Sequence, residues 1–240
     1  MGRHPVLETL RAGRPLQRLW VQTQLAEGSL KEILSLARDK GVVIHEVPRA
    51  KLDALAGELN HQGVVGMMSV APIVTLDDIY EQVQARGAEA LLIVVDQIQD
   101  PQNLGAIIRV AGAVGADAVI MPNRNTAPLT PAVRKASAGS TEHVPLATVP
   151  NLAQGIEIIK KWGIFVYAAD PEGDTLYTQG DFRGPTAIVI GAEDKGIRPL
   201  VQKRCDQSIR LPMQGQVASL NAAAACAVLA FEVIRQRQGS

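Results

Sequence analysis

The chain has 240 residues, of which 47% are apolar, and this is enough to build a sizeable hydrophobic core. Its formal net charge is zero and 3% of its residues are aromatic. The bulk composition therefore lacks the basic surplus typical of nucleic-acid binders and an obvious platform for base stacking.

Nothing in the sequence indicates a membrane span, a leader or a metal site. The longest apolar run, residues 222–231, is about half as long as a bilayer span, and no apolar segment follows the basic N-terminus. We therefore expect a cytoplasmic protein without a membrane partner. Two cysteines, Cys205 and Cys226, are too few for a disulfide framework or a metal cage.

Residues 1–70 alternate short helical and strand patterns and predict a small α/β domain. Helices are expected over residues 5–11 and 29–38 and after Pro48, and strands over 18–22, 42–46 and 64–70. Ser29 is the expected N-cap of the second helix, and Gly41 lies beyond its end. Pro72 and the mainly polar helix expected over residues 76–86 predict a linker over residues 71–87.

From residue 88 onward the alternation of strand and helix is stronger, and the strands are continuously apolar. This pattern is typical of a parallel sheet that helices cover on both faces. The expected strands are 90–95, 118–121, 144–148, 164–168, 186–190 and 208–211. The expected helices are 101–114, 131–138, 152–162, 199–204 and 219–237.

Two clusters of basic residues stand out against the neutral bulk charge. Each is a candidate patch for nucleic acid, although a solvated helix face is the more ordinary interpretation. The clusters are Arg3, His4, Arg11, Arg14 and Arg18 near the N-terminus, and Lys195, Arg198, Lys203, Arg204 and Arg210 near the C-terminus.

The junction after the strand at 90–95 is a candidate ligand site, because α/β proteins bind ligands where parallel strands lead into helices. Asp100 as N-cap and Pro101 at the first helical position are explained by the helix alone. Gly105 and Arg109 are not. Gly105, four residues before Arg109, is interpreted as a gap through which a ligand approaches the guanidinium. Glycine-rich dinucleotide and phosphate loops are absent, and no histidine is placed for nucleophilic catalysis.

Three turns near the C-terminus expose backbone groups that could bind a small molecule. Gly191 and Gly196 bracket Glu193, which could either cap the next helix or contact a ligand. A second strand ends at Leu211-Pro212-Met213. Ser219-Leu220-Asn221 then opens an alanine-rich helix, and Ser219 could be only its N-cap.

The three segments Asn103-x-Gly105-x-x-x-Arg109, Gly191-Ala192-Glu193-x-x-Gly196 and Leu211-Pro212-Met213 with Ser219-Leu220-Asn221 occur in this order. Together they resemble the motifs of the SpoU (TrmH-type) RNA ribose 2′-O-methyltransferases of the SPOUT superfamily. Gly2-Arg3-His4-Pro5-Val6 and His61-Gln62-Gly63-Val64-Val65 resemble the start and end of the N-terminal RNA-binding domain found in its ribosomal-RNA branch. The resemblance covers nearly the whole chain.

The resemblance implies an α/β fold with two domains. A SPOUT domain over residues 88–240 would hold a parallel sheet and a deep C-terminal trefoil knot, and residues 1–70 would bind RNA. It also implies S-adenosylmethionine as methyl donor, no metal, and a homodimer. The donor would lie against Gly191, Gly196, Leu211, Met213 and Leu220. Arg109 would be the principal catalytic residue, with Asn103, Glu193, Ser219 and Asn221 completing the site.

The activity implied is methylation of a ribose 2′-hydroxyl in RNA, with a guanosine of 23S rRNA as the expected substrate. The alternatives are a tRNA or antibiotic-resistance rRNA methyltransferase, and a ribosome-assembly factor that binds RNA without turnover. Because a guanidinium stays protonated, we expect Arg109 to stabilise a developing alkoxide and a nearby phosphate. Asp194 stands where many relatives have a second glycine. If the backbone there is left-handed, aspartate is among the few side chains that tolerate it, so we expect the turn to survive.

Overall fold

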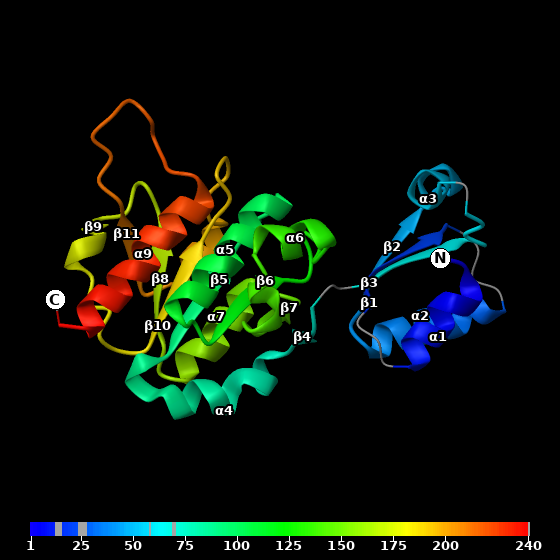
Figure 1. Ribbon diagram of the computed structural model, residues 1–240, viewed down its shortest axis with the longest axis horizontal. Coiled ribbons are helices and arrows are strands. Elements are labelled where there is room, and N and C mark those ends of the chain that lie inside the picture. Colours follow the sequence, from blue (N-terminus) through cyan, green and yellow to red (C-terminus); the bar gives the residue numbers. More distant parts are fainter. Residues whose placement is uncertain (13–15, 24–27, 58, 69–70, 240) are drawn as a thin grey trace. The chain divides into compact units, whose positions relative to one another are not determined.

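The computed structural model describes residues 1–12, 16–23, 28–57, 59–68 and 71–239. Contacts between residues divide the chain into two compact units, Met1–Val70 and Ala71–Ser240. Both units appear in Figure 1. No helix in the described residues is long and apolar enough to cross a membrane.

The N-terminal unit is a three-stranded sheet in the order β2-β1-β3, with β2 parallel and β3 antiparallel to β1. One face packs on α1 and α2 through a core that includes Leu10, Leu19 and Ile33. Leu52 and Ala56 of α3 pack on Val65 in a smaller second core. Its elements are α1 (Arg3–Arg11), β1 (Leu16–Gln22), α2 (Ser29–Asp39), β2 (Val43–Val47), α3 (Arg49–Ala56) and β3 (Val64–Met68).

These six elements occur at the predicted places, with boundaries that differ by one or two residues. Residues 69–70 of the expected last strand lie outside the described residues. The N-cap of α2 is Gly28 rather than Ser29, which is the first helical residue. An N-cap has a non-helical backbone, and the left-handed φ of 59° at Gly28 fits that requirement.

The second unit is built on an eight-stranded sheet in which every pair of neighbouring strands is parallel, as predicted. The strand order is β4-β7-β6-β5-β10-β8-β11-β9. Its strands are β4 (Ile73–Val74), β5 (Leu91–Val95), β6 (Ala118–Pro122), β7 (Leu146–Val149), β8 (Phe165–Ala169), β9 (Thr175–Leu176), β10 (Thr186–Ile190) and β11 (Gln207–Arg210). The two short edge strands, β4 and β9, are additions to the predicted set.

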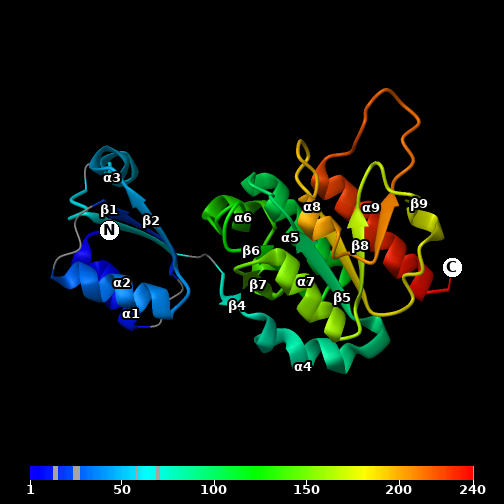
Figure 2. The same ribbon diagram turned by 180° about the vertical axis from the view of Figure 1, so that it is seen from behind.

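Helices cover both faces of this sheet. The α-helices are α4 (Leu76–Arg86), α5 (Pro101–Val114), α6 (Pro131–Ala136), α7 (Leu152–Lys161), α8 (Pro199–Gln202) and α9 (Ala222–Arg237). Figure 1 shows α5 and α9 side by side in front of the central strands, and Figure 2 shows α7 and α8 on the opposite face. Alternate strand residues such as Leu92, Val94 and Val189 join α4, α7 and α8 in one buried cluster. Burial on both faces explains why these strands are continuously apolar.

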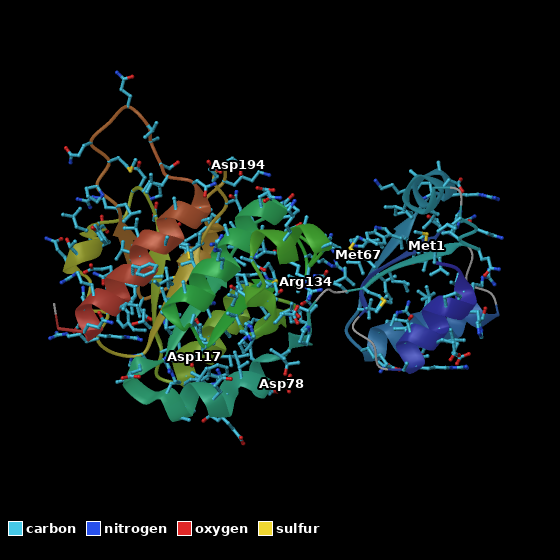
Figure 3. The ribbon with its side chains drawn as sticks, viewed as in Figure 1. Met1, Met67, Asp78, Asp117, Arg134 and Asp194 are labelled. Carbon is cyan, nitrogen blue, oxygen red and sulfur yellow. The ribbon has the colours of Figure 1, made fainter. Side chains whose placement is uncertain are left out.

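The expectation of a linker over residues 71–87 differs from what the structure contains. Leu76, Ile79 and Val83 of α4 are buried in the core of the second unit, and β4 pairs with β7. Arg86, the last residue of α4, also contacts the core of this unit. Its Nε lies 3.3 Å from the buried carboxylate of Asp117, which is labelled in Figure 3. The three apolar positions recur with helical spacing among polar residues, so α4 is an amphipathic covering helix and not a spacer.

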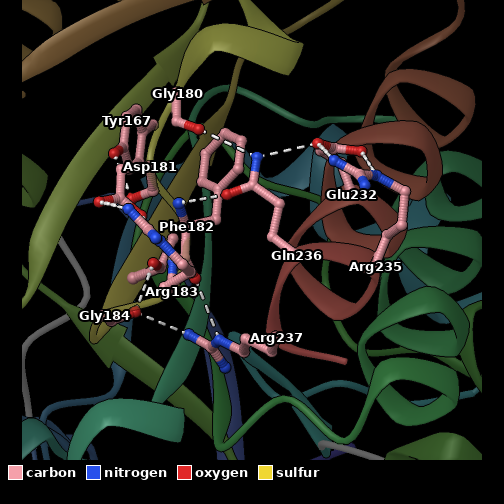
Figure 4. Close-up of polar contacts among 11 residues, drawn as sticks. Tyr167, Gly180, Asp181, Phe182, Arg183, Gly184, Glu232, Arg235, Gln236 and Arg237 are labelled. Carbon is pink, nitrogen blue, oxygen red and sulfur yellow. Dashed lines mark hydrogen bonds and ion pairs between the residues drawn. The ribbon is translucent and has the colours of Figure 1, made fainter. Parts of the chain in front are cut away.

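The last turns of α9 are anchored by a network of side-chain hydrogen bonds (Figure 4). The side chain of Gln236 accepts from the backbone N–H of Phe182 at 2.9 Å and donates to the carbonyl of Gly180 at 3.0 Å. The guanidinium of Arg237 donates to the backbone carbonyls of Phe182, Glu89, Ala90 and Gly184 at 2.5–3.1 Å. These bonds connect the C-terminal helix to the segments that precede β5 and β10.

Candidate active site

Four strands that lie side by side in the sheet, β5, β10, β8 and β11, direct their carboxyl ends to one edge. The turns that follow them begin at Asp96, Gly191, Asp170 and Leu211. Open parallel sheets bind ligands at this edge. The predicted motif segments are therefore brought together by the order of the strands, although more than a hundred residues separate the first from the last.

The turn after β10 depends on two glycines. A side chain at Gly191 would collide with the backbone of Gly196, and Gly196 itself has φ of 62°. Ala192 and Gly196 exchange two backbone hydrogen bonds of 3.1 and 2.8 Å. The result is a closed loop that presents Glu193, Asp194 and Lys195 to solvent.

Asn221 connects the three motifs. Its Oδ1 accepts from the backbone N–H groups of Ala223 and Ala224, and this makes Asn221 the N-cap of α9. Its Nδ2 donates to Oδ1 of Asn103 at 2.8 Å and, at 3.4 Å, to Oε2 of Glu193. The amide therefore holds a carboxylate and a second amide together at the sheet edge.

A cavity of about 290 Å³ lies beside this cluster. All five residues predicted to bind the donor line it, as do Glu193 and Ser219. The walls combine buried apolar side chains, such as Ile190, Ile209 and Leu229, with accessible backbone at Gly191 and Gly196. The predicted set is Gly191, Gly196, Leu211, Met213 and Leu220.

Sequence reasoning missed part of this cavity. Asp170, Pro171 and Glu172 line it from the turn after β8, and Ala225 lines it from α9. The signal was present in the sequence, since Asp170 follows a predicted parallel strand, and carboxyl ends of such strands are where ligands bind. Asp170 also accepts a short 2.5 Å hydrogen bond from Nε2 of Gln202.

A second cavity of about 420 Å³ shares the turn at residues 192–194 with the first. Gln97, Gln99 and Asn103 line it from the segment that connects β5 to α5. Gln97 has a left-handed backbone with φ of 62°, which is uncommon for a residue other than glycine. Glu193 therefore lines both cavities.

The interpretation of Gly105 as an opening for a ligand is wrong. Gly105 is buried, and a Cβ there would collide with Ala136 and lie 2.8 Å from the carbonyl of Val133 in α6. The glycine therefore allows α6 to pack closely on α5. Arg109 is exposed on α5, and it lines neither of the two cavities.

One local expectation also requires correction, and the condition considered for Asp194 does not arise. Ser219 is exposed and Asn221 takes the N-cap position, so α9 begins at Ala222 and not at 219. Asp194 is exposed at the turn (Figure 3) and is not among the described residues with positive φ, because Gly196 supplies the left-handed conformation.

Ion pairs and backbone contacts occupy several members of the C-terminal basic cluster. Arg198 pairs with the buried Asp96 at 2.7 Å, and Arg204 lies 3.2 Å from Glu157. Arg210 donates to the carbonyl of Gly173. Burial raises the pKa of Cys205 and of Cys226 to about 12, which makes both thiols poor nucleophiles at neutral pH.

Comparison with known proteins identifies both units. Residues 90–231 match the SpoU rRNA methylase family, and residues 1–71 match a domain described as RNA 2′-O ribose methyltransferase substrate binding. The chain is 40% identical over 237 residues to YacO of Bacillus subtilis (strain 168), which is named for the TrmH family of tRNA/rRNA methyltransferases. That alignment covers 99% of this chain and 95% of YacO.

Two solved structures are similar to this one. The SpoU methyltransferase AviRb from Streptomyces viridochromogenes, in complex with AdoMet, has a TM-score of 0.64 and 26% identity, and the match covers 100% of this chain and 90% of AviRb. A structure described for 2-OH methylation of C/U34 on tRNA has a TM-score of 0.58 and 29% identity. That match covers 63% of this chain and 98% of the tRNA-related chain.

Proposed function

Because the chain belongs to the SpoU family of RNA methyltransferases, we propose that it transfers a methyl group from S-adenosylmethionine to a ribose 2′-hydroxyl of RNA. The observation that carries the proposal is the amide of Asn221, which is hydrogen-bonded to Asn103 and Glu193 beside the cavity at the sheet edge. Three motifs distant in sequence supply these three residues.

The chemistry of the cavity lining suits S-adenosylmethionine. The donor has an adenine, a ribose and a positively charged sulfonium, and the cavity has apolar walls, accessible backbone and carboxylates at Asp170, Glu172 and Glu193. Gly191, Leu211 and Leu220 would hold it mainly through main-chain groups, with Gly196 and Met213 completing the walls. When bound, the sulfonium supplies an activated methyl group.

The protein's own contribution is to orient the acceptor hydroxyl and to stabilise the charge that develops on its oxygen. We assign Asn103 and Glu193 to orienting this hydroxyl, since Glu193 lines both cavities and Asn103 lines the second. Ser219 lines the donor side. We assign Arg109 to stabilisation of the alkoxide and a neighbouring phosphate, with the proton passing to phosphate or water.

Arg109 lies outside the cavities of its own chain, and this supports a homodimer. An exposed apolar stripe runs along α9, with Ala224, Val228 and Phe231 at helical spacing. Since α9 packs beside α5, two copies that meet on these helices would bring Arg109 toward an interface. The site would then be completed between protomers.

A guanosine of 23S rRNA is the proposed substrate, with tRNA as the second candidate. The matched N-terminal substrate-binding unit supports rRNA, because the tRNA-related structure leaves more than a third of this chain without a counterpart. AviRb, by contrast, matches the full chain.

The decisive test is methyl transfer from radiolabelled S-adenosylmethionine to 23S rRNA and, separately, to total tRNA. We expect incorporation into 23S rRNA and mapping of the modified position to a ribose 2′-oxygen. Incorporation into tRNA alone would reject the rRNA assignment. RNA binding without incorporation into either would leave the non-catalytic assembly factor as the function.

A further inference from the structure

A cavity of about 600 Å³ in the N-terminal unit is formed by residues outside the candidate active site. It lies where the start of α1, the end of β1, the start of α3 and the turn before β3 meet. Its polar lining includes Arg3, His4, Gln22, Arg49, His61 and Gln62. Two segments from opposite ends of the unit, Arg3-His4 and His61-Gln62-Gly63, therefore line the same cavity.

Arg3 is held in place by the turn that it faces. Its backbone N–H donates to Oε1 of Gln62 at 3.1 Å, and its Nε donates to the carbonyl of Gln62 at 3.0 Å. No ion pair involves Arg3 within the described part of the chain. Its Nε is thus used for positioning, and the two terminal amino groups of the guanidinium remain available for a ligand.

The facing turn is itself fixed by a hydrogen-bonded chain. His61, 7% exposed, accepts from the backbone N–H of Gly63 through Nδ1, so the ring proton is on Nε2, which donates to Asp53 at 2.8 Å. Gln62, which lies between His61 and Gly63 in the sequence, has a left-handed φ of 49°. Backbone strain of this kind persists where surrounding contacts enforce it, and it is concentrated at binding sites.

The cavity carries two guanidinium groups and is rich in amides. Two arginines and two histidines line it together with amide side chains, and no carboxylate is among its lining residues in the described structure. Asp53, which does not line the cavity, is hydrogen-bonded to His61 and lies 4.0 Å from Nε of Arg49. Guanidinium groups bind phosphate, amides bind base edges, and a volume of this size accommodates a nucleotide.

We infer that this cavity binds an unpaired nucleotide of the substrate RNA, with Arg3 and Arg49 on its phosphate and the amides of Gln22 and Gln62 on its base. The inference rests on the proposed function, since it makes the cavity the place where the substrate is recognised. A base stacked within a duplex would not reach these groups, so single-stranded segments are the expected ligand.

The test measures binding of the full-length protein to a fluorescein-labelled single-stranded oligoribonucleotide of mixed sequence and to its duplex. Arg49→Gln should weaken single-strand binding roughly tenfold and reduce the slope of log affinity against log salt by about 0.7. Arg3→Gln should act in the same way. Arg38→Gln is the matched control, because Arg38 is exposed on α2 and does not line the cavity, and it should bind like wild type.

Folding and donor binding are measured separately from RNA binding. The side chain of Arg49 is 74% exposed, so its replacement should leave thermal unfolding unchanged even if Arg3→Gln lowers it. Calorimetric binding of S-adenosylmethionine should equal that of wild type in all three variants. A wild-type protein that binds RNA but transfers no methyl group would reject the proposed function and leave this inference standing.

Two results would overturn the inference. One is single-strand affinity of Arg3→Gln and Arg49→Gln equal to that of Arg38→Gln. The other concerns competition by 5′-GMP. If 5′-GMP displaces the oligonucleotide with an inhibition constant equal to the dissociation constant of the oligonucleotide, the cavity is a site for a small nucleotide and not for RNA.

Discussion

The side-chain amide of Asn221 has two roles, one for each of its polar atoms. The oxygen caps α9, and the nitrogen joins Asn103 and Glu193. A site residue that is also a helix cap links the position of the reacting groups to the start of the C-terminal helix. The two roles can be separated, because serine also caps helices but is too short to bridge.

We therefore predict different outcomes for two substitutions at this position. Asn221→Ala should lower the free energy of unfolding by about 1 kcal/mol through loss of the cap and should also reduce kcat. Asn221→Ser should retain most of the stability and still reduce kcat. Urea unfolding and methyl-transfer kinetics on the same preparations test this. Normal kcat in the serine variant would show that the bridge to Asn103 and Glu193 is dispensable.

The packing of α6 on α5 decides the role of Gly105. Gly105 was interpreted from the sequence as an approach to Arg109, but α6 fills the space above it. Glycine inside a helix lowers its stability relative to alanine by up to about 1 kcal/mol, and close packing of two helices is the compensation that the structure offers.

Gly105→Ala should accordingly destabilise the protein by roughly 1–3 kcal/mol through overpacking, despite the better helix propensity of alanine. Gly184→Ala is the matched control, since an added Cβ there meets open space and its φ is not positive. Thermal or urea unfolding distinguishes the two. Equal stability of both variants would contradict the packing role of Gly105.

The end of α9 depends on Arg237. Burial lowers the pKa of its guanidinium, which donates to four backbone carbonyls. Figure 4 shows two of them, those of Phe182 and Gly184. Replacing the side chain leaves several of these acceptors without a partner.

Arg237→Gln should lower the free energy of unfolding by roughly 2–4 kcal/mol. Arg204→Gln, which removes an ion pair whose two side chains are nearly half exposed, should cost less than about 1 kcal/mol. Urea denaturation of both variants provides the comparison. A small effect at Arg237 would contradict its role as an anchor of α9.

At the scale of the whole molecule, the proposed homodimer explains two facts together, the exposed apolar stripe on α9 and the position of Arg109 outside its own cavities. Phe231, at the C-terminal end of that stripe, is 52% exposed. The trefoil knot stays a prediction from the family resemblance.

Phe231→Glu should convert the dimer to a monomer in sedimentation experiments and should abolish methyl transfer, because a charge at an apolar interface is costly to bury. Leu200→Glu is the control, as Leu200 is a comparably exposed apolar residue on α8, on the other face of the sheet. A wild-type monomer with full activity would contradict the proposed assembly.

The order of the motifs, the alternation of strands and helices and the turn bracketed by Gly191 and Gly196 could be predicted from the sequence by itself. These features depend on interactions within a few residues: helix capping, side-chain periodicity and allowed backbone angles. For the same reason the predicted strands and helices occur close to their expected places.

Only the tertiary structure showed which distant segments meet. Burial of α4 against the sheet, the contact of α6 with Gly105 and the entry of Asp170 and Glu172 into the cavity depend on strand order and helix packing. So does the joining of Arg3 to Gln62 in the N-terminal unit. Local patterns do not specify such contacts, because their free energy comes from surfaces that the chain brings together only when the whole unit has folded.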